Sequence, residues 1–306
     1  MNEKQAPTVK QTGYFKSFDG TRIYFEVRGE GKPLVFAYGI GCLINHWQYQ
    51  IKSFSSAYQT IAFDYRGHHK SELPQDRTTM TVDALARDLH ALLDHLGIQR
   101  AGFFGHSFGV QVILRAYDLA PQYFENLVFI NGFASDPISG MFGNGLASQI
   151  FRYLKSGFDY APQTISYLWE KGVSNPFAVQ LAALLGGFNI ELTSLKDIEI
   201  YLRGVSTLDM SAYLHLFQNM MDYDGRPVYA RINVPTLIIS GAKDSVTPQH
   251  YQQDMHQKIK GSEFQAVPYG SHCTQLDMPD FVNLRAARFL ESSGCSANKS
   301  SCSPIL

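Results

Sequence analysis

The sequence lacks the features that mark membrane, secreted and nucleic-acid-binding proteins. Its formal net charge is −1 and it has no long basic run, which argues against nucleic acid or an anionic membrane surface as the main partner. No segment approaches the roughly 20 apolar residues of a membrane span. Residues 1–7 are polar and lack the apolar stretch of a signal peptide. We therefore expect a cytoplasmic protein without a transmembrane segment.

Cysteine is scarce and scattered. The four cysteines, Cys42, Cys273, Cys295 and Cys302, form no C-x-x-C pair. Metal ligation needs clustered ligands, so we expect no metal site. Without a secretory signal, the thiols are expected to be reduced. Cys295 and Cys302 lie in a Ser-, Gly- and Asn-rich tail, residues 292–306, which we expect to be flexible.

Short apolar runs, by contrast, recur along the chain and alternate with helical patterns. The first two strands, residues 14–18 and 21–27, are joined at Asp19-Gly20, a strong hairpin signal. The later strands are predicted at residues 33–38, 60–65, 101–104, 126–131, 234–240 and 263–267. Thr81 can cap a helix that runs to about Leu96. Strands that are apolar throughout and alternate with helices indicate a mostly parallel sheet covered on both faces.

A helical block interrupts this rhythm. Residues 137–227 are mostly amphipathic helix with glycine and proline breaks, and the strand pattern resumes at Val234. The block is therefore predicted to be an insertion between two halves of one sheet. Its aromatic residues, among them Tyr201, Tyr213 and Phe217, are individually explained by helix packing. As a group they indicate an apolar cavity above the sheet.

The pentapeptide Gly105-His106-Ser107-Phe108-Gly109 stands between an apolar strand and a helix. A G-x-S-x-G pattern in this setting is typical of a nucleophile elbow, whose tight turn requires the flanking glycines. The turn leaves the serine hydroxyl at the head of a helix, where free N–H groups favour negative charge. The pentapeptide alone is a weak signal because glycine and serine are common, but the strand–turn–helix setting makes it specific. Ser107 is the candidate nucleophile.

Three further segments add to the signal of the pentapeptide. With them, residues 14–291 of the chain resemble the α/β-hydrolase family whose members have a helical cap. The segments that carry the likeness are residues 241–248 (GAKDSVTP), 269–273 (YGSHC) and 63–71 (FDYRGHHKS). They are similar to the family's acid loop, histidine loop and D-x-R-G-x-G-x-S turn. The resemblance places the acid at Asp244 and the base at His272, and the order Ser, Asp, His is the one this fold uses. A serine hydroxyl needs such a base because it is a poor nucleophile at neutral pH.

The resemblance also implies a domain organisation. The sheet is expected to be an eight-stranded, mostly parallel, doubly wound α/β-hydrolase sheet with an inserted helical cap. The expected ranges are 14–136 and 228–291 for the core, 137–227 for the cap, and 1–13 and 292–306 for flexible ends.

An oxyanion hole needs hydrogen-bond donors already in place, each worth roughly 3–4 kcal/mol. We expect the backbone N–H groups of Phe108 and Ile40 to supply them. The family usually has His-Gly where this chain has Tyr38-Gly39, and it usually has glycine at the position of His69. Because the donor is a backbone group, the tyrosine need not remove it. The replacement of histidine by Tyr38 leaves open how side chains pack beneath the loop that carries Ile40.

Other titratable residues near the motifs have simpler explanations than catalysis. His106, His68 and His69 are expected to pack or hydrogen-bond locally rather than to catalyse. Asp136 follows the strand after the elbow, where some relatives place the acid, but Asp244 has the better loop context.

Together these features predict a cofactor-free serine hydrolase that cleaves a small or medium apolar carboxylic ester or lactone through an acyl-enzyme. Lactonase, thioesterase, C–C bond hydrolase, acyltransferase and perhydrolase share the same triad, because fold and triad leave the leaving group open. Haloalkane dehalogenase and epoxide hydrolase are disfavoured, since their elbow nucleophile would be aspartate. A hydrolase-like binding protein without turnover is the non-enzymatic alternative, and homodimerisation stays open.

Overall fold

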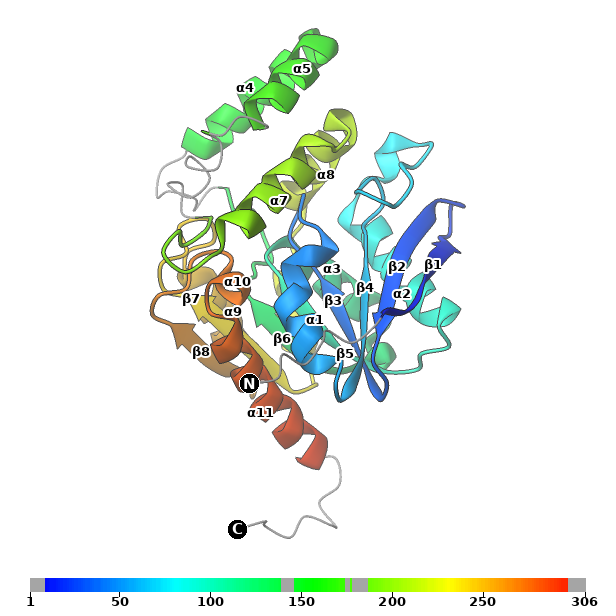
Figure 1. Cartoon of the computed structure of the whole chain (residues 1–306), viewed down its shortest axis with the longest axis vertical. Coiled ribbons are helices and arrows are strands. Elements are labelled where there is room, and N and C mark those ends of the chain that lie inside the picture. Colours follow the sequence, from blue (N-terminus) through cyan, green and yellow to red (C-terminus); the bar gives the residue numbers. More distant parts are fainter. Residues whose placement is uncertain (1–8, 139–145, 174–176, 178–186, 297–306) are drawn as a thin grey trace.

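The structure is a computed structural model that describes residues 9–138, 146–173, 177 and 187–296. Its centre is an eight-stranded sheet with helices on both faces (Figure 1). The strand order is β1-β2-β4-β3-β5-β6-β7-β8. β1, β2 and β4 pair antiparallel, and every pairing from β4 through β3 to β8 is parallel. The predicted eight-stranded, mostly parallel sheet is confirmed.

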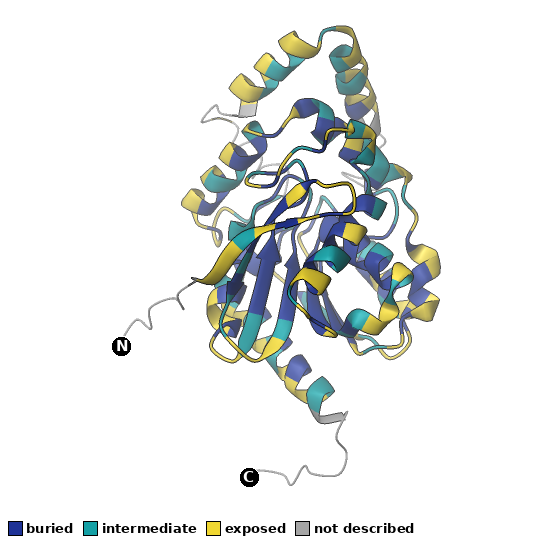
Figure 2. Cartoon of the chain, turned by 90° about the vertical axis from the view of Figure 1, so that its right-hand side faces the viewer, coloured by how far each residue is buried: buried dark blue, intermediate teal, exposed yellow. Residues whose placement is uncertain are grey.

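The strands lie close to the ranges predicted from the apolar runs. They are β1 (Val9–Lys16), β2 (Arg22–Arg28), β3 (Lys32–Ala37), β4 (Tyr58–Phe63), β5 (Ala101–His106), β6 (Phe124–Ile130), β7 (Thr236–Gly241) and β8 (Glu263–Val267). All residues of β5 and β7 are buried, and in Figure 2 the centre of the sheet is dark blue. This burial on both faces explains why these strands are apolar throughout. β1 and β2 form the hairpin predicted at Asp19-Gly20, where Gly20 has a φ of 84°.

Helices connect the strands. They are α1 (Gln48–Phe54), α2 (Val82–His95), α3 (Phe108–Leu119), α9 (His250–Lys258), α10 (Thr274–Asp277) and α11 (Pro279–Ser296), with 3-10 turns η1 (Ile44–Trp47), η2 (Arg77–Thr79), η3 (Pro121–Tyr123) and η5 (Arg226–Arg231). The predicted cap of α2 is present, because the Thr81 hydroxyl accepts the N–H of Ala84 at 3.1 Å. Such a cap stabilises a helix by about 1 kcal/mol.

The remaining helices belong to the block predicted as an insertion. They are α4 (Leu146–Tyr160), α5 (Pro162–Val173), α7 (Leu195–Ser206) and α8 (Met210–Asp222). In Figure 1, α7 and α8 lie above one end of the sheet, and α4 and α5 lie beyond them. Parts of the predicted block, residues 139–145, 174–176 and 178–186, are outside the described residues. The division of the chain into core and cap stays a prediction.

The predicted flexible ends require two corrections. β1 begins at Val9, which pairs with Arg28, so residues 9–13 are part of the sheet. α11 continues to Ser296, where the sequence had suggested a tail from residue 292. In its last turns the side chain of Ser292 donates to the carbonyl of Phe289 at 2.9 Å. Residues 1–8 and 297–306, with Cys302, are outside the described residues.

Candidate active site

Ser107 occupies the turn between β5 and α3. Its φ of 54° and ψ of −122° are values that L residues seldom adopt, and its N–H donates to the carbonyl of Ile130 at 3.1 Å. The flanking glycines are sterically required. A Cβ on Gly109 would lie 2.2 Å from the carbonyl oxygen of Ala37, and one on Gly105 would lie 2.8 Å from Ile113. Close packing of β3, β5 and α3 therefore dictates the pentapeptide pattern.

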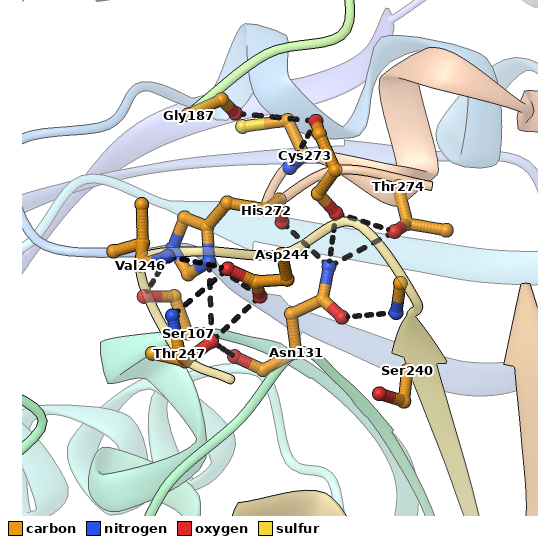
Figure 3. Close-up of polar contacts among 12 residues, drawn as sticks. Ser107, Asn131, Gly187, Ser240, Asp244, Val246, Thr247, His272, Cys273 and Thr274 are labelled. Carbon is orange, nitrogen blue, oxygen red and sulfur yellow. Dashed lines mark hydrogen bonds and ion pairs between the residues drawn. The ribbon is translucent and has the colours of Figure 1, made fainter. Parts of the chain in front are cut away.

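Three predicted site residues come together at this turn. Ser107 Oγ is 2.9 Å from His272 Nε2, and His272 Nδ1 is 2.9 Å from Asp244 Oδ2 (Figure 3). They follow β5, β8 and β7, and the carboxyl ends of these parallel strands meet at one edge of the sheet. With a proton on Nδ1 donated to the carboxylate, Nε2 is free to accept the serine proton. The carboxylate that contacts His272 is that of Asp244, whereas Oδ1 of the alternative acid Asp136 accepts the N–H of Ile138 at 2.8 Å.

The carboxylate of Asp244 is held from several sides. Oδ1 accepts the N–H groups of Val246 at 2.9 Å and Thr247 at 2.8 Å. The hydroxyl of Thr247 lies 2.7 Å from Oδ2 and 3.2 Å from His272 Nδ1. The carboxylate therefore points at the imidazole with little freedom to rotate.

Asn131 joins the two loops that present the acid and the histidine, a role that its place at a strand end did not reveal. Its φ is 47°, and its side chain points toward the histidine loop (Figure 3). Nδ2 donates to the carbonyl oxygens of Ser271 at 2.8 Å and His272 at 2.7 Å, and lies 3.0 Å from the hydroxyl of Thr274. Oδ1 accepts the N–H of Gly241 at 2.7 Å. The only signal in the sequence is a polar residue that ends an apolar strand.

Two other histidines of the motifs donate hydrogen bonds to backbone carbonyls, and for His106 the partner is the distant His272 and not the local group that was expected. His106 Nε2 donates to the carbonyl of His272 at 2.9 Å, and His69 Nε2 donates to that of Cys42 at 2.8 Å. His69 has a φ of 46°, so it adopts the left-handed conformation that the family usually fills with glycine. Burial lowers the pKa of His106 well below its usual value, which keeps its ring neutral.

The loop after β3 lies directly over the elbow. A Cβ on Gly39 would be 3.2 Å from both Ser107 Cβ and His106 Nδ1. In the described part of the chain, no turn or loop hydrogen bond uses the N–H of Ile40 or of Phe108. The N–H of Phe108, at the first position of α3, also has no partner within the helix. Both groups stay our predicted oxyanion donors.

Tyr38 fills the space beneath this loop. It is fully buried, and its hydroxyl donates to Asp64 Oδ1 at 3.2 Å and accepts the N–H of Tyr65 at 2.9 Å. The hydroxyl of Tyr65 in turn donates to the carbonyl of Tyr38 at 2.7 Å. Burial raises the pKa of Asp64 to about 6. The phenol therefore supports the loop through paired hydrogen bonds in place of the family's usual histidine.

A cavity of about 300 Å³ opens onto Ser107 and His272. Its lining is mainly apolar, with the aromatic residues Phe133, Phe188, Tyr201, Tyr213 and Phe217. Four of them, Phe188, Tyr201, Tyr213 and Phe217, belong to the aromatic group from which the sequence predicted a cavity. A larger hollow of about 450 Å³ lies elsewhere, beside Glu26, Arg28 and Lys70, and does not include the serine.

The structure also gathers three residues that are not clustered in the sequence. Among the described residues, Cys42, His46 and His106 each place a potential ligand atom within 4.8 Å of the others. Cys42 and His46 are four residues apart, but His106 comes from another strand end. Only the fold brings them together.

Comparison with known proteins points to one family. The family model for the alpha/beta hydrolase fold matches residues 32–163. The chain is similar to the α/β-hydrolase superfamily in this segment and in its fold. Among its α/β-hydrolase relatives, 3-oxoadipate enol-lactonase 2 of Acinetobacter baylyi is 29% identical, over 82% of this chain and 85% of its own length. Epoxide hydrolase 4 of Mus musculus is 25% identical, over 86% of this chain and 75% of its own length.

The α/β-hydrolase fold is equally clear from solved structures. The bromoperoxidase from Bacillus anthracis superposes with a TM-score of 0.74 at 22% identity, covering 92% of this chain and 100% of that one. The family and the relatives support a hydrolase that acts on small molecules. Among the described residues, every helix is too short or too polar to cross a membrane.

Proposed function

We propose that this protein is an α/β-hydrolase, namely a serine hydrolase that cleaves small or medium apolar carboxylic esters, lactones included, through an acyl-enzyme. The observation that carries the proposal is the continuous chain of hydrogen bonds from Ser107 through His272 to Asp244 at the mouth of an apolar cavity.

In the proposed mechanism, Ser107 Oγ attacks the carbonyl carbon while His272 Nε2 takes its proton. The carbonyl oxygen becomes an oxyanion that accepts the N–H groups of Ile40 and Phe108. His272 then gives the proton to the leaving alkoxide, and the acyl group stays on the serine. A water molecule, deprotonated by His272, releases the acid. Asp244 stabilises the imidazolium in both halves of the reaction.

The cavity supports the choice of substrate class. At about 300 Å³ it lies at the lower end of ligand pockets, which indicates a small or medium acyl group. Its aromatic walls offer apolar contact and few polar partners. The enol-lactonase relative favours an internal ester as one substrate, whose leaving alcohol stays attached to the acyl group. Thioesters, C–C bonds, acyl transfer and perhydrolysis would use the same acyl-enzyme with other leaving groups or acceptors.

Epoxide opening fits the proposed nucleophile poorly, although an epoxide hydrolase is among the relatives. A carboxylate that attacks an epoxide forms an ester, which water can cleave. A serine at that position would form an ether, which water does not cleave under these conditions. Ser107 therefore favours acyl chemistry.

The test combines active-site labelling with turnover. Wild type should react with a fluorophosphonate probe and hydrolyse short p-nitrophenyl esters, and Ser107→Ala should lose labelling and at least about 10⁴-fold in kcat. Ser240→Ala is the matched control, because that buried hydroxyl donates to Gln252 at 3.1 Å and is not part of the hydrogen-bonded chain. If Ser107→Ala and wild type behave alike, the proposal fails. Ligand binding without any product would favour the non-enzymatic alternative.

A further inference from the structure

Cys42, His46 and His106 form a compact, buried group beneath the cavity. Their relative exposures are 5%, 2% and 1%, and one potential ligand atom of each lies within 4.8 Å of the others. In a tetrahedral site with metal–sulfur distances of about 2.3 Å and metal–nitrogen distances of about 2.0–2.1 Å, ligand atoms are roughly 3.3–3.6 Å apart. Side-chain rotations that move each atom by about an ångström would therefore be sufficient to close the site.

The ring nitrogens that face this group lack hydrogen-bond partners. Both nitrogens of His46 and Nδ1 of His106 are buried and unpaired among the described residues. A buried polar atom without a partner costs about 1–3 kcal/mol. A bound metal ion would give one nitrogen of each ring a partner.

The chemistry of the three side chains suits a transition metal. Burial lowers the pKa of His46 to about 3, so its ring is neutral and offers a lone pair at neutral pH. His106 donates its Nε2 hydrogen to the carbonyl of His272 at 2.9 Å, which leaves Nδ1 as the lone-pair atom. This contact matches the usual support of a metal-bound histidine. Burial raises the pKa of the Cys42 thiol, so a metal has to displace its proton.

We propose that Cys42, His46 and His106 bind one Zn²⁺ or a similar thiophilic divalent ion. The thiol of Cys42 gives its proton to solvent as the metal–sulfur bond forms, and the two imidazoles bind as neutral ligands. All three residues line the cavity beside Ser107, so the metal enters from it and its fourth position faces it. A mixed sulfur and nitrogen donor set favours zinc over calcium or magnesium.

Such a metal would inhibit the proposed ester hydrolysis, and this part rests on the proposed function. A Cβ on Gly39 would be 3.2 Å from His106 Nδ1, 3.3 Å from Cys42 Sγ and 3.2 Å from Ser107 Cβ, so two ligands adjoin the loop that crosses the elbow. Ile40, the predicted oxyanion donor, stands next to Gly39. A metal that draws Cys42 and His106 together shifts this loop and occupies the space beside the nucleophile.

Cobalt is a spectroscopic probe for the site. In a full-length background with Cys295→Ser and Cys302→Ser, which removes the C-terminal thiols, Co²⁺ should bind one per chain. It should produce a thiolate-to-cobalt charge-transfer band that Zn²⁺ abolishes. Cys42→Ser should remove the band and weaken Zn²⁺ binding at least by the roughly hundredfold that outer-shell mutations alone can cause. His46→Asn should also weaken binding, which provides a second variant if the first misfolds.

Cys273→Ser is the matched control. Cys273 is buried and lines the same cavity but is not one of the three grouped residues, so its variant should keep the band. Circular dichroism checks that each variant is folded. The proposal is overturned if the background gives no band, or if the band survives in folded Cys42→Ser and His46→Asn.

A second measurement separates this proposal from the proposed function. Zn²⁺ should slow fluorophosphonate labelling of Ser107 at least tenfold in the background and have no such effect in Cys42→Ser. If the cobalt band forms but wild type and Ser107→Ala label alike, the metal site stands and the serine mechanism falls. If Ser107 labels normally and no band forms, the reverse holds.

Discussion

Replacing Asn131 with aspartate tests how the two catalytic loops are held. The change is nearly isosteric, and aspartate tolerates the positive φ of 47° at this position. It removes the Nδ2 group, which donates to the carbonyl oxygens of Ser271 and His272 at 2.8 and 2.7 Å. Each carbonyl keeps a second donor, the Thr274 hydroxyl for Ser271 and the His106 ring for His272, so each lost hydrogen bond costs about 0.5–1.5 kcal/mol. Asn131→Asp should therefore lower the free energy of unfolding by about 1–3 kcal/mol in urea titrations.

The same substitution should reduce activity beyond its effect on folding. The carbonyl of His272 loses one of its two donors and is then held by His106 alone, so the imidazole is less firmly positioned relative to Ser107 Oγ. A displacement of about 1 Å near the reacting atoms can cost about a hundredfold in rate. We expect a loss of this size in kcat/KM for a short p-nitrophenyl ester, measured where the variant is fully folded.

Asn126→Asp is the matched control for this experiment. Asn126 is buried in β6, the strand that Asn131 directly follows, and its Oδ1 has no hydrogen-bond partner among the described residues. Its replacement should lower stability through the buried charge but leave the fluorophosphonate labelling rate per folded molecule unchanged. The role of Asn131 is refuted if the free energy of unfolding of Asn131→Asp is within about 1 kcal/mol of the wild-type value and the variant reacts with the fluorophosphonate at the wild-type rate. Asn131 would then not hold the histidine loop.

Three further substitutions test the packing around the site. Tyr38→Phe removes the hydroxyl that donates to Asp64 and should cost about 1–3 kcal/mol in urea unfolding, and wild-type stability would contradict this. Burial raises the pKa of Asp64 from 3.8 to about 6, so the native state holds this proton more tightly than the unfolded chain. Stability should then fall by about 3 kcal/mol as the pH rises from about 4 to about 6. Asp64→Asn should remove that slope from urea titrations across this range, and an unchanged slope would exclude Asp64 as its source. Gly109→Ala places a Cβ 2.2 Å from the carbonyl oxygen of Ala37 and should cost at least about 3 kcal/mol, whereas Gly172→Ala, with open space around it, should fold normally by circular dichroism. Equal stability of these two alanine variants would contradict the packing argument.

The sequence was sufficient for features that depend on local patterns. The hairpin at Asp19-Gly20, the cap at Thr81 and the apolar strands each follow from neighbouring residues. The elbow was visible because its close packing permits only glycine beside the serine. The positions of Asp244 and His272 came from the resemblance of their loops to the family's acid and histidine loops, and the fold brings these loops to one edge of the sheet.

Features that depend on contacts between distant segments were not visible. The side chain of Asn131 contacts Ser271 and Gly241, more than a hundred positions away, and its residue type gives no hint of this. The grouping of Cys42 with His106 likewise depends on how the loop after β3 crosses the elbow. The ends of β1 and α11 were missed because polar residues extend both elements beyond the apolar pattern.

The backbone conformation of Ser107 implies a conflict between stability and activity. A φ of 54° with a ψ of −122° suits glycine, and holding another residue there costs about 1–3 kcal/mol. A chain selected for stability alone would have glycine at this position, and Ser107→Gly should be more stable than wild type while losing the hydroxyl. Serine at this strained position of the turn therefore lowers the free energy of unfolding. Selection would tolerate it only where the hydroxyl is needed.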